Sequence, residues 1–345
     1  MHSTTSAFDH VSRRDALRVL GLSGVAALLA RARLGAAETA PAPALHPVAV
    51  SLAGKQPGFY RFRIGEIEAM ACDDGARAIP LDTPLWAGFS QAKAVADLEA
   101  AAMPTDKIDL PFSVLLVRLG AELVLIDAGA GATFGPAAGR LPAQLAAAGL
   151  RPGQITAIVL THAHGDHYGG LLDAAGAPAF PNARLFVHRR EYDYWMSADA
   201  DVSQMVIPEK QARGMFPQAQ KFFGALRERW QFFVPGDKLF GALEIVDAPG
   251  HTPGHIAVLI GSGPARLLHL ADTGHHHVLS FANPDWVYRF DIQPKLAVET
   301  RRRLFGRSAA ERLRVFGAHF PFPGLGHVRA VGDHYEHLLE PWSSV

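Results

Sequence analysis

Cysteine is almost absent from this sequence: Cys72 is the only one among 345 residues, so no intramolecular disulfide can form. An excess of either charge is absent too, because Lys plus Arg and Asp plus Glu number 33 each. Without a basic surplus, nucleic acids and anionic membranes are poor partners, and a small molecule is the expected one. The chain is 49% hydrophobic and has no visible internal repeat, which predicts an ordinary folded core.

Long hydrophobic runs are absent as well. The uncharged stretch at 19–30 is 12 residues long, whereas a membrane-spanning helix needs about 20, so no stable membrane insertion is expected. The pair Arg13-Arg14 precedes this stretch and resembles a twin-arginine export signal. We therefore expect residues 1–40 to be a cleaved signal for a periplasmic or secreted protein, and residues 41–56 to be a linker. The alternative is an amphipathic first helix of the fold.

A dense cluster of metal-competent side chains follows a short apolar run. The run at 155–160 predicts a buried strand, and His162, His164, Asp166 and His167 come directly after it. Residues i and i+2 of an extended segment point the same way, so His162 and His164 can bind one ion together. The intervening glycine permits a turn that leaves Asp166 and His167 free to face a second ion. The pattern predicts a metal site, and the alternative is a solvated polar loop.

The order His-x-His-x-Asp-His resembles the motif of the metallo-β-lactamase superfamily. Three later segments resemble its remaining ligand positions and supply His251, Asp272 and His319. By this resemblance, Asp272 bridges two ions. The other ligands of the first ion are His162, His164 and His251. The other ligands of the second ion are Asp166, His167 and His319.

The donor set indicates which chemistry such a site supports. Imidazoles and carboxylates without thiolate suit zinc, iron, manganese or cobalt, and two Zn²⁺ ions are the expected cofactors. Two divalent ions and two carboxylates leave a positive site that attracts a carbonyl or phosphoryl oxygen. Metal binding lowers the pKa of water from about 15.7 to about 7, which would provide a bridging hydroxide as nucleophile. The implied reaction is hydrolysis, with Asp166 and Asp272 as candidate catalytic residues.

Single residues exclude several branches of the superfamily. His164 stands where the oxygen-reducing di-iron branch has glutamate. The cysteine-dependent lactamases need a cysteine ligand, but Cys72, the only cysteine, lies far from every ligand motif of this sequence. The segments 57–65, 180–182 and 319–327 are closer to the methyl parathion hydrolase group, which includes lactonases and arylesterases. This resemblance implies an exported homodimer. It also implies that residues 57–345 form an α/β domain, the αββα sandwich of two mixed β-sheets flanked by helices.

Hydrophobic periodicity alone predicts a mixed α/β chain. The expected strands lie at 59–64, 66–72, 113–118, 122–127, 155–160, 184–188, 243–247, 256–260 and 266–271. The expected helices lie at 141–148, 189–196, 218–229 and 294–315.

The substrate pocket is less sharply indicated than the ligands. The resemblance implies aromatic walls at Trp195 and at Phe222 or Phe223, although aromatic residues in helices usually belong to the core. His275 stands where the parathion hydrolases are apolar, so it either makes the pocket more polar or lies in a solvated loop. Asp127 either supports a ligand imidazole or is a strand-end turn residue. No Lys or Arg lies within the ligand motifs, so no clamp for an anionic substrate is expected.

Two classes of function remain open from the sequence. The first is a binuclear hydrolase of small hydrophobic esters, lactones or phosphotriesters, with an N-acyl homoserine lactone hydrolase (a quorum-quenching enzyme) as the alternative substrate choice. The second is a non-catalytic metal-binding protein on the same fold. All seven ligand positions are filled by metal-competent residues, which favours the first class.

Overall fold

The computed structural model describes residues 57–262 and 264–341. The expected signal at 1–40 and linker at 41–56 lie outside these residues and stay predictions, as does the homodimer. Within the described residues, no helix combines the length and the apolar character that a bilayer crossing requires.

The first sheet has seven strands in the order β1-β2-β4-β5-β6-β7-β8. The pairs from β1 to β5 are antiparallel, and those from β5 to β8 are parallel, so the sheet is mixed. Its strands are β1 (Phe59–Ile64), β2 (Ile67–Pro80), β4 (Lys107–Leu119), β5 (Glu122–Ile126), β6 (Ala157–Val159), β7 (Arg184–His188) and β8 (Trp230–Phe233).

The second sheet also has seven strands, in the order β16-β15-β14-β12-β11-β10-β9. Only β12 and β14 pair in parallel. Its strands are β9 (Lys238–Leu239), β10 (Leu243–Asp247), β11 (Ile256–Ser262), β12 (Ala265–His269), β14 (Arg314–Phe316), β15 (Leu325–Val331) and β16 (His334–Leu339). A separate two-stranded ladder joins β3 (Trp86–Ala87) to β13 (Val287–Tyr288).

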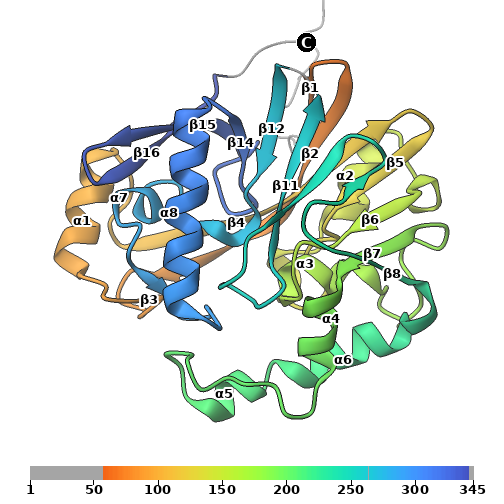
Figure 1. Cartoon of the computed structure of the whole chain (residues 1–345), viewed down its shortest axis with the longest axis horizontal. Helices are drawn as coiled ribbons and strands as arrows, with labels where there is room; N and C mark the ends of the chain where they lie inside the picture. The colour runs from red at the N-terminus through yellow and green to blue at the C-terminus, as the bar shows by residue number, and fades with distance from the viewer. Residues whose placement is uncertain (1–56, 263, 342–345) are drawn as a thin grey trace, which may run out of the picture. The chain divides into compact units, whose positions relative to one another are not determined.

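The sheets pack face to face, and helices cover their outer faces. Alternation along β4 shows why: Leu115 and Val117 enter the core between the sheets, whereas Val114 and Leu116 enter the core under the helices. The first sheet is covered by α2 (Leu141–Ala147), α3 (Gly165–Tyr168), α4 (Arg189–Met196) and α6 (Phe216–Ala225). The second is covered by α7 (Leu279–Ala282) and α8 (Pro294–Ala310). Figure 1 shows α8 on the opposite side of the sheets from α2. The predicted αββα sandwich is confirmed.

Two shorter helices lie outside this cover. The helix α1 (Gln91–Ala100) belongs to a separate apolar cluster with the β3–β13 ladder. The helix α5 (Glu209–Arg213) lies in the long connection between α4 and α6, at the bottom of Figure 1.

The predicted helix at 294–315 is wrong at its C-terminal end. The helix α8 stops at Ala310, Arg312 takes a positive φ of 51°, and Arg314–Phe316 forms β14 against β12. Pairing with a strand more than forty residues earlier along the chain decides this segment, and local periodicity does not register such pairing. The strands β8, β15 and β16 were not predicted either, because only their pairing in the sheets distinguishes them from loops.

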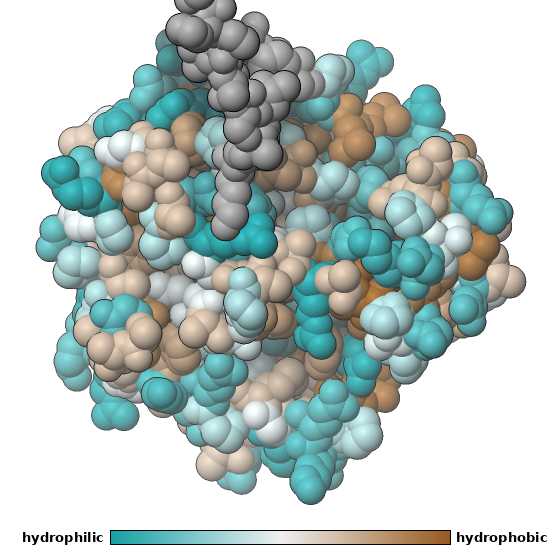
Figure 2. All heavy atoms as spheres, turned by 180° about the vertical axis from the view of Figure 1, so that it is seen from behind, coloured by the Kyte–Doolittle hydropathy of each residue, from teal (hydrophilic) through white to brown (hydrophobic). Residues whose placement is uncertain are grey.

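The surface is mixed in character. The face shown in Figure 2 carries hydrophilic and hydrophobic residues side by side. Cys72 does not contribute to it, because its side chain is fully buried and burial raises the pKa of its thiol to about 12.

Candidate metal centre

All seven predicted ligands lie at strand ends, where loops of both sheets meet. His162 and His164 follow β6, and Asp166 and His167 belong to the first turn of α3. His251 lies between β10 and β11, Asp272 follows β12, and His319 follows β14. The first sheet therefore supplies four ligands and the second supplies three.

Four of these residues form the first ligand group: His162, His164, His251 and Asp272. His164 Nδ1 lies 2.8 Å from His251 Nε2. The carboxylate atom Asp272 Oδ2 lies 3.6 Å from His162 Nε2 and 3.4 Å from His251 Nε2. The ligand atoms all lie within 4.8 Å of one another, so one ion could contact all four.

The second ligand group contains Asp166, His167, His319 and, again, Asp272. Asp272 Oδ1 lies 3.1 Å from His167 Nε2, and Asp272 Oδ2 lies 3.1 Å from His319 Nε2. Asp166 Oδ2 is 3.5 Å from His319 Nε2 and 3.8 Å from His167 Nε2. Asp272 is therefore shared by both groups, the position that a bridging ligand would take.

The residues of both groups fit divalent ions. Among the described residues, the buried atoms His162 Nε2 and His164 Nε2 have no hydrogen-bond partner. Such atoms are costly unless something else binds them. Imidazole nitrogens with carboxylate oxygens form the donor set that zinc prefers. These residues therefore form two candidate metal-binding groups.

Protonation supports this reading at three ligands. Burial lowers the pKa of His162 and His164 well below the ordinary value, and neighbouring imidazoles act in the same direction. Burial raises the pKa of Asp272, but His167, His319 and other histidines outweigh it and hold this pKa well below the usual range. Neutral imidazole and ionised carboxylate are the metal-binding forms.

Three other ligands show the opposite shift: burial lowers the pKa of His167, His251 and His319, but nearby carboxylates outweigh it, and the pKa of His251 is raised to about 9. At His167, Asp272 and Asp127 outweigh burial and hold the pKa well above the ordinary value. An ion bound to the second ligand group therefore competes with a proton on this ring.

A cavity of about 470 Å³ opens onto both ligand groups. It is lined by His164, Asp166, His251, Asp272 and His319 of these groups. Its other lining residues include the aromatic Phe134, Tyr168, Trp195, Tyr288 and Phe290. This volume lies within the range of small-molecule sites, and polar groups converge within a partly apolar wall, as such sites require. We refer to it as the metal cavity.

Comparison with known proteins agrees with this geometry. A family model described as the metallo-beta-lactamase superfamily matches residues 109–305, which is more than half of the chain. The chain belongs to this superfamily.

Relatives of the superfamily include named lactonases. A protein of Mycobacterium tuberculosis named as a probable metallo-hydrolase is 30% identical over 52% of this chain, and the match spans 62% of that protein. The chain thus covers less than two thirds of this relative's length. The N-acyl homoserine lactonase AttM of Azorhizobium caulinodans is 34% identical over 36% of this chain and 44% of its own length.

Solved structures of the superfamily align more completely. AidC, described as a dizinc quorum-quenching lactonase in complex with a product, is 30% identical with a TM-score of 0.79. That alignment covers 83% of this chain and 99% of AidC. AbOPH, described as a hydrolase of the beta lactamase superfamily, is 26% identical with a TM-score of 0.77, over 84% of this chain and 100% of AbOPH.

Two carboxylates orient metal-ligand rings from behind, as is usual in the metal sites of such enzymes. Asp127 Oδ2 lies 2.8 Å from His167 Nδ1, and both Asp127 oxygens accept hydrogen bonds from Thr161. Asp127 also takes a positive φ of 65° at the end of β5. It is therefore both a strand-end turn residue and the hydrogen-bond partner of a ligand ring. Asp291 Oδ1 lies 2.8 Å from His251 Nδ1. Asp291 could not be predicted from the sequence, because it is an isolated acidic residue 40 positions from its partner.

Replacing Asp127 with asparagine is expected to weaken ion binding at the second ligand group by about 10- to 100-fold, because the amide orients the His167 ring less well than the carboxylate. Asparagine tolerates the positive φ, so the backbone should be retained. A zinc titration against a chromophoric chelator measures the change. The control is Asp109→Asn, whose carboxylate is exposed and, within the part of the chain that the structure describes, pairs with Lys107. Two equally tight zinc equivalents in the Asp127 variant would contradict the role of this residue.

The structure corrects two of the predicted pocket residues. Trp195 does line the metal cavity, and its ring packs edge-on against His164 with a centroid distance of 5.6 Å. Phe222 instead packs against Tyr168 at the margin of the helical core, and Phe223 is fully buried there. His275 is not solvated either: it is buried, stacks on Tyr288 at 3.6 Å between centroids, and lies 3.4 Å from Asp272 Oδ2. It thus lies behind the cavity wall that Tyr288 forms.

The expected absence of cationic residues holds for the ligand motifs but not for the metal cavity. Arg77 and Arg289 line it. Neither forms an ion pair within the described residues, and the buried Nε of Arg289 lacks a partner there. Arg77 lies in β2, and Arg289 directly follows β13. Neither segment shares a sequence pattern with the ligand motifs.

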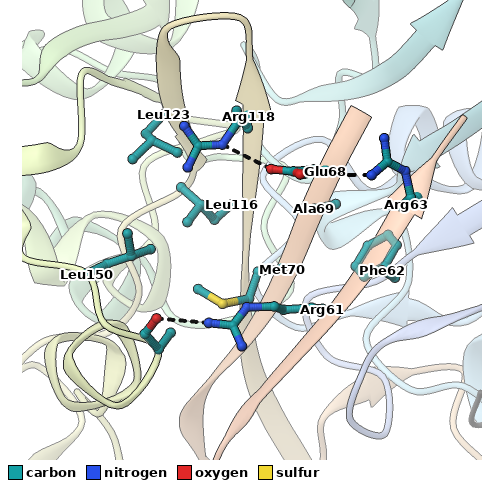
Figure 3. A pocket seen from close by; sticks show the side chains of 11 residues that line it. Arg61, Phe62, Arg63, Glu68, Ala69, Met70, Leu116, Arg118, Leu123 and Leu150 are labelled. Atoms are coloured by element: carbon teal, nitrogen blue, oxygen red, sulfur yellow. Dashed lines mark hydrogen bonds and ion pairs between the residues drawn. The ribbon is translucent and has the colours of Figure 1, made fainter. Parts of the chain in front are cut away.

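A second cavity of about 430 Å³ lies on the outer face of the first sheet, beyond the end of α2. Figure 3 shows Arg63 and Arg118 directed at Glu68, while Arg61 donates to the carbonyl oxygen of Ala148. Partly exposed arginines that cover apolar side chains with their stems are common on sheet faces.

The apolar base of this second cavity includes Met70, Leu116 and Leu123, all of which are already buried. Neither of the two candidate metal-binding groups found among the described residues lies there. The metal cavity is therefore the candidate active site.

Proposed function

We propose that this enzyme hydrolyses lactones and carboxylic esters that carry an apolar arm, at a centre of two zinc ions. N-acyl homoserine lactones are the substrates favoured within this class. The observation that carries the proposal is the pair of ligand groups sharing Asp272 at the base of a partly aromatic cavity. The lactonases AidC and AttM among the relatives support the choice of substrate.

Different residues of the chain would have different roles in this reaction. The two ligand groups would hold the ions. When bound, such ions would polarise the acceptor oxygen of the substrate and lower the pKa of a bound water. Phe134, Tyr168 and Trp195 would pack against the apolar arm of the substrate. Burial raises the pKa of Tyr288, so its hydroxyl keeps its proton and can donate a hydrogen bond to a substrate oxygen.

A single kinetic panel tests the substrate class. We expect acyl lactones and aryl esters to give kcat/KM values at least about tenfold above those of paraoxon-type phosphotriesters, a difference near 1.4 kcal/mol. The physical reason is space: a lactone brings one arm into the cavity of about 470 Å³, whereas a phosphotriester brings three substituents. The control is the same protein after removal of metal by a chelator, which should lose activity on every substrate.

Two outcomes of this panel would change the conclusion. Phosphotriesters as the better substrates would identify a phosphotriesterase instead. A protein that contains two metal equivalents and turns over no member of the panel would favour a metal-binding protein without this catalysis.

A further inference from the structure

Glu191 is a fully buried carboxylate in the first turn of α4, and four donors surround it. Its Oε1 accepts from the backbone N–H of Ala163 at 2.7 Å and from the indole N–H of Trp195 at 2.8 Å. Its Oε2 accepts from the hydroxyl of Thr252 at 2.7 Å and from the backbone N–H of Gly254 at 2.9 Å. A carboxylate with two donors on each oxygen is satisfied without water.

These donors belong to the two loops that carry the first ligand group. Ala163 stands between His162 and His164, in the loop that leaves the first sheet. Thr252 is adjacent to His251, in the loop between β10 and β11 of the second sheet. Each carboxylate oxygen bonds one of these loops, so a single side chain joins them across the two sheets.

The contact with the second loop is also close at the backbone. A Cβ atom at Gly254 would lie 2.3 Å from the backbone nitrogen of Glu191, so only glycine permits this approach. On the far side of the same loop, the hydroxyl of Thr300 in α8 donates to the carbonyl oxygen of Pro249 at 2.7 Å. The loop of His251 is therefore held between α4 and α8.

Glu191 also reaches the cavity wall through Trp195, which follows it by one helical turn. The hydrogen bond to the indole fixes a ring that both lines the metal cavity and packs against His164. One carboxylate thus bonds to the neighbours of three ligands and to one wall residue, and within the described residues none of its hydrogen bonds goes to a ligand atom.

We propose that Glu191 is a positioning residue for the first ligand group: it fixes the separation of the His162–His164 loop from the His251 loop, and with it the ion that bridges them. The inference rests on the two-ion centre proposed above. The competing reading is that Glu191 only stabilises the fold. The two readings differ in one measurable quantity, the affinity of a single ion.

The test is Glu191→Gln, measured by zinc titration of the apoprotein against a chromophoric chelator. The amide keeps the shape but turns one acceptor into a donor, which opposes the N–H groups of one loop. Wild type should bind two tight equivalents, and the variant should bind one equivalent about 10- to 100-fold more weakly while the other stays tight. Wild type with fewer than two equivalents would count against the two-ion proposal, independently of Glu191.

Combination with Asp127→Asn locates the weakened ion. Asp127 supports His167 of the second ligand group, so each single variant should keep one tight equivalent and the double variant should keep none. A double variant that still binds one tight equivalent would mean that both residues act on the same ion, and would overturn the assignment of Glu191 to the first group.

The matched control is Asp74→Asn. Asp74 is likewise a buried carboxylate that accepts hydrogen bonds from the backbone N–H groups of Ala130 and Leu141, and within the described residues none of its hydrogen bonds goes to a ligand loop. The Asp74→Asn substitution should lower the melting temperature and leave both zinc equivalents tightly bound. The same behaviour in Glu191→Gln would show a purely stabilising role and overturn the proposal.

If the Glu191 variant does not fold, Thr252→Val removes only one of the four hydrogen bonds. It should weaken the same equivalent by a smaller factor, and an unchanged affinity would overturn the proposal.

Discussion

Replacing Asp272 with alanine is expected to lower kcat by roughly 1000-fold or more, because this carboxylate belongs to both ligand groups. Alanine removes the shared ligand and leaves histidines whose rings it had held within 3.1 to 3.6 Å of its oxygens. Both candidate ligand groups lose a member at once. Among the described residues, no other side chain belongs to both groups.

Steady-state kinetics on an aryl ester, with elemental analysis of the same sample, measures both consequences of Asp272→Ala. The bound metal should fall below two equivalents per chain. Asp333→Asn is the control, since that side chain is almost fully exposed and lies in the turn between β15 and β16. A variant with activity within tenfold of wild type and two bound metals would contradict the assignment of Asp272 as the shared ligand.

Replacing Arg301 with methionine is expected to lower the free energy of unfolding by about 3–5 kcal/mol. The guanidinium of Arg301 is buried, donates to the carbonyl oxygens of Thr273, Pro284 and Trp286, and lies 3.5 Å from Asp291. Without it, a buried carboxylate loses its cation and three carbonyl groups lose a donor. Asp291 also contacts His251, so the damage should extend to metal binding.

The neighbouring residue provides a matched control for this prediction. Arg302 lies in the same helix but is partly exposed, and its ion pair with Asp285 should contribute less than about 1 kcal/mol. Chemical denaturation of Arg301→Met and Arg302→Met compares the two. Similar losses for both variants would show that burial of the Arg301 charge does not matter to stability.

The metal ligands could be predicted from the sequence because metal binding imposes a local pattern. His162, His164, Asp166 and His167 are close in sequence, and the later ligands recur in recognisable segments. Residues that support the ligands have no such pattern. Glu191 is 28 positions from Ala163, and Asp291 is 40 from His251, so only the folded chain brings them together.

The cavity walls were harder to predict for a different reason. Tyr288 and Arg289 come from a two-residue strand and its flank, which are too short to give any periodicity. An aromatic residue on a helix can face the cavity or the core, and its spacing does not distinguish the two. Trp195 and Phe222 both lie in helices, but Trp195 faces the cavity and Phe222 packs against Tyr168.

The distribution of the ligands along the chain also sets the order of events during synthesis. His162 and His319 are separated by 157 positions (319 − 162). At about 5–20 residues per second, the last ligand emerges about 8 to 30 s after the first. During that interval the first ligand group stays incomplete until Asp272 has been made, and the second until His319 has been made. We therefore expect both groups to bind their ions stably only after translation of β14 and the residues that follow it.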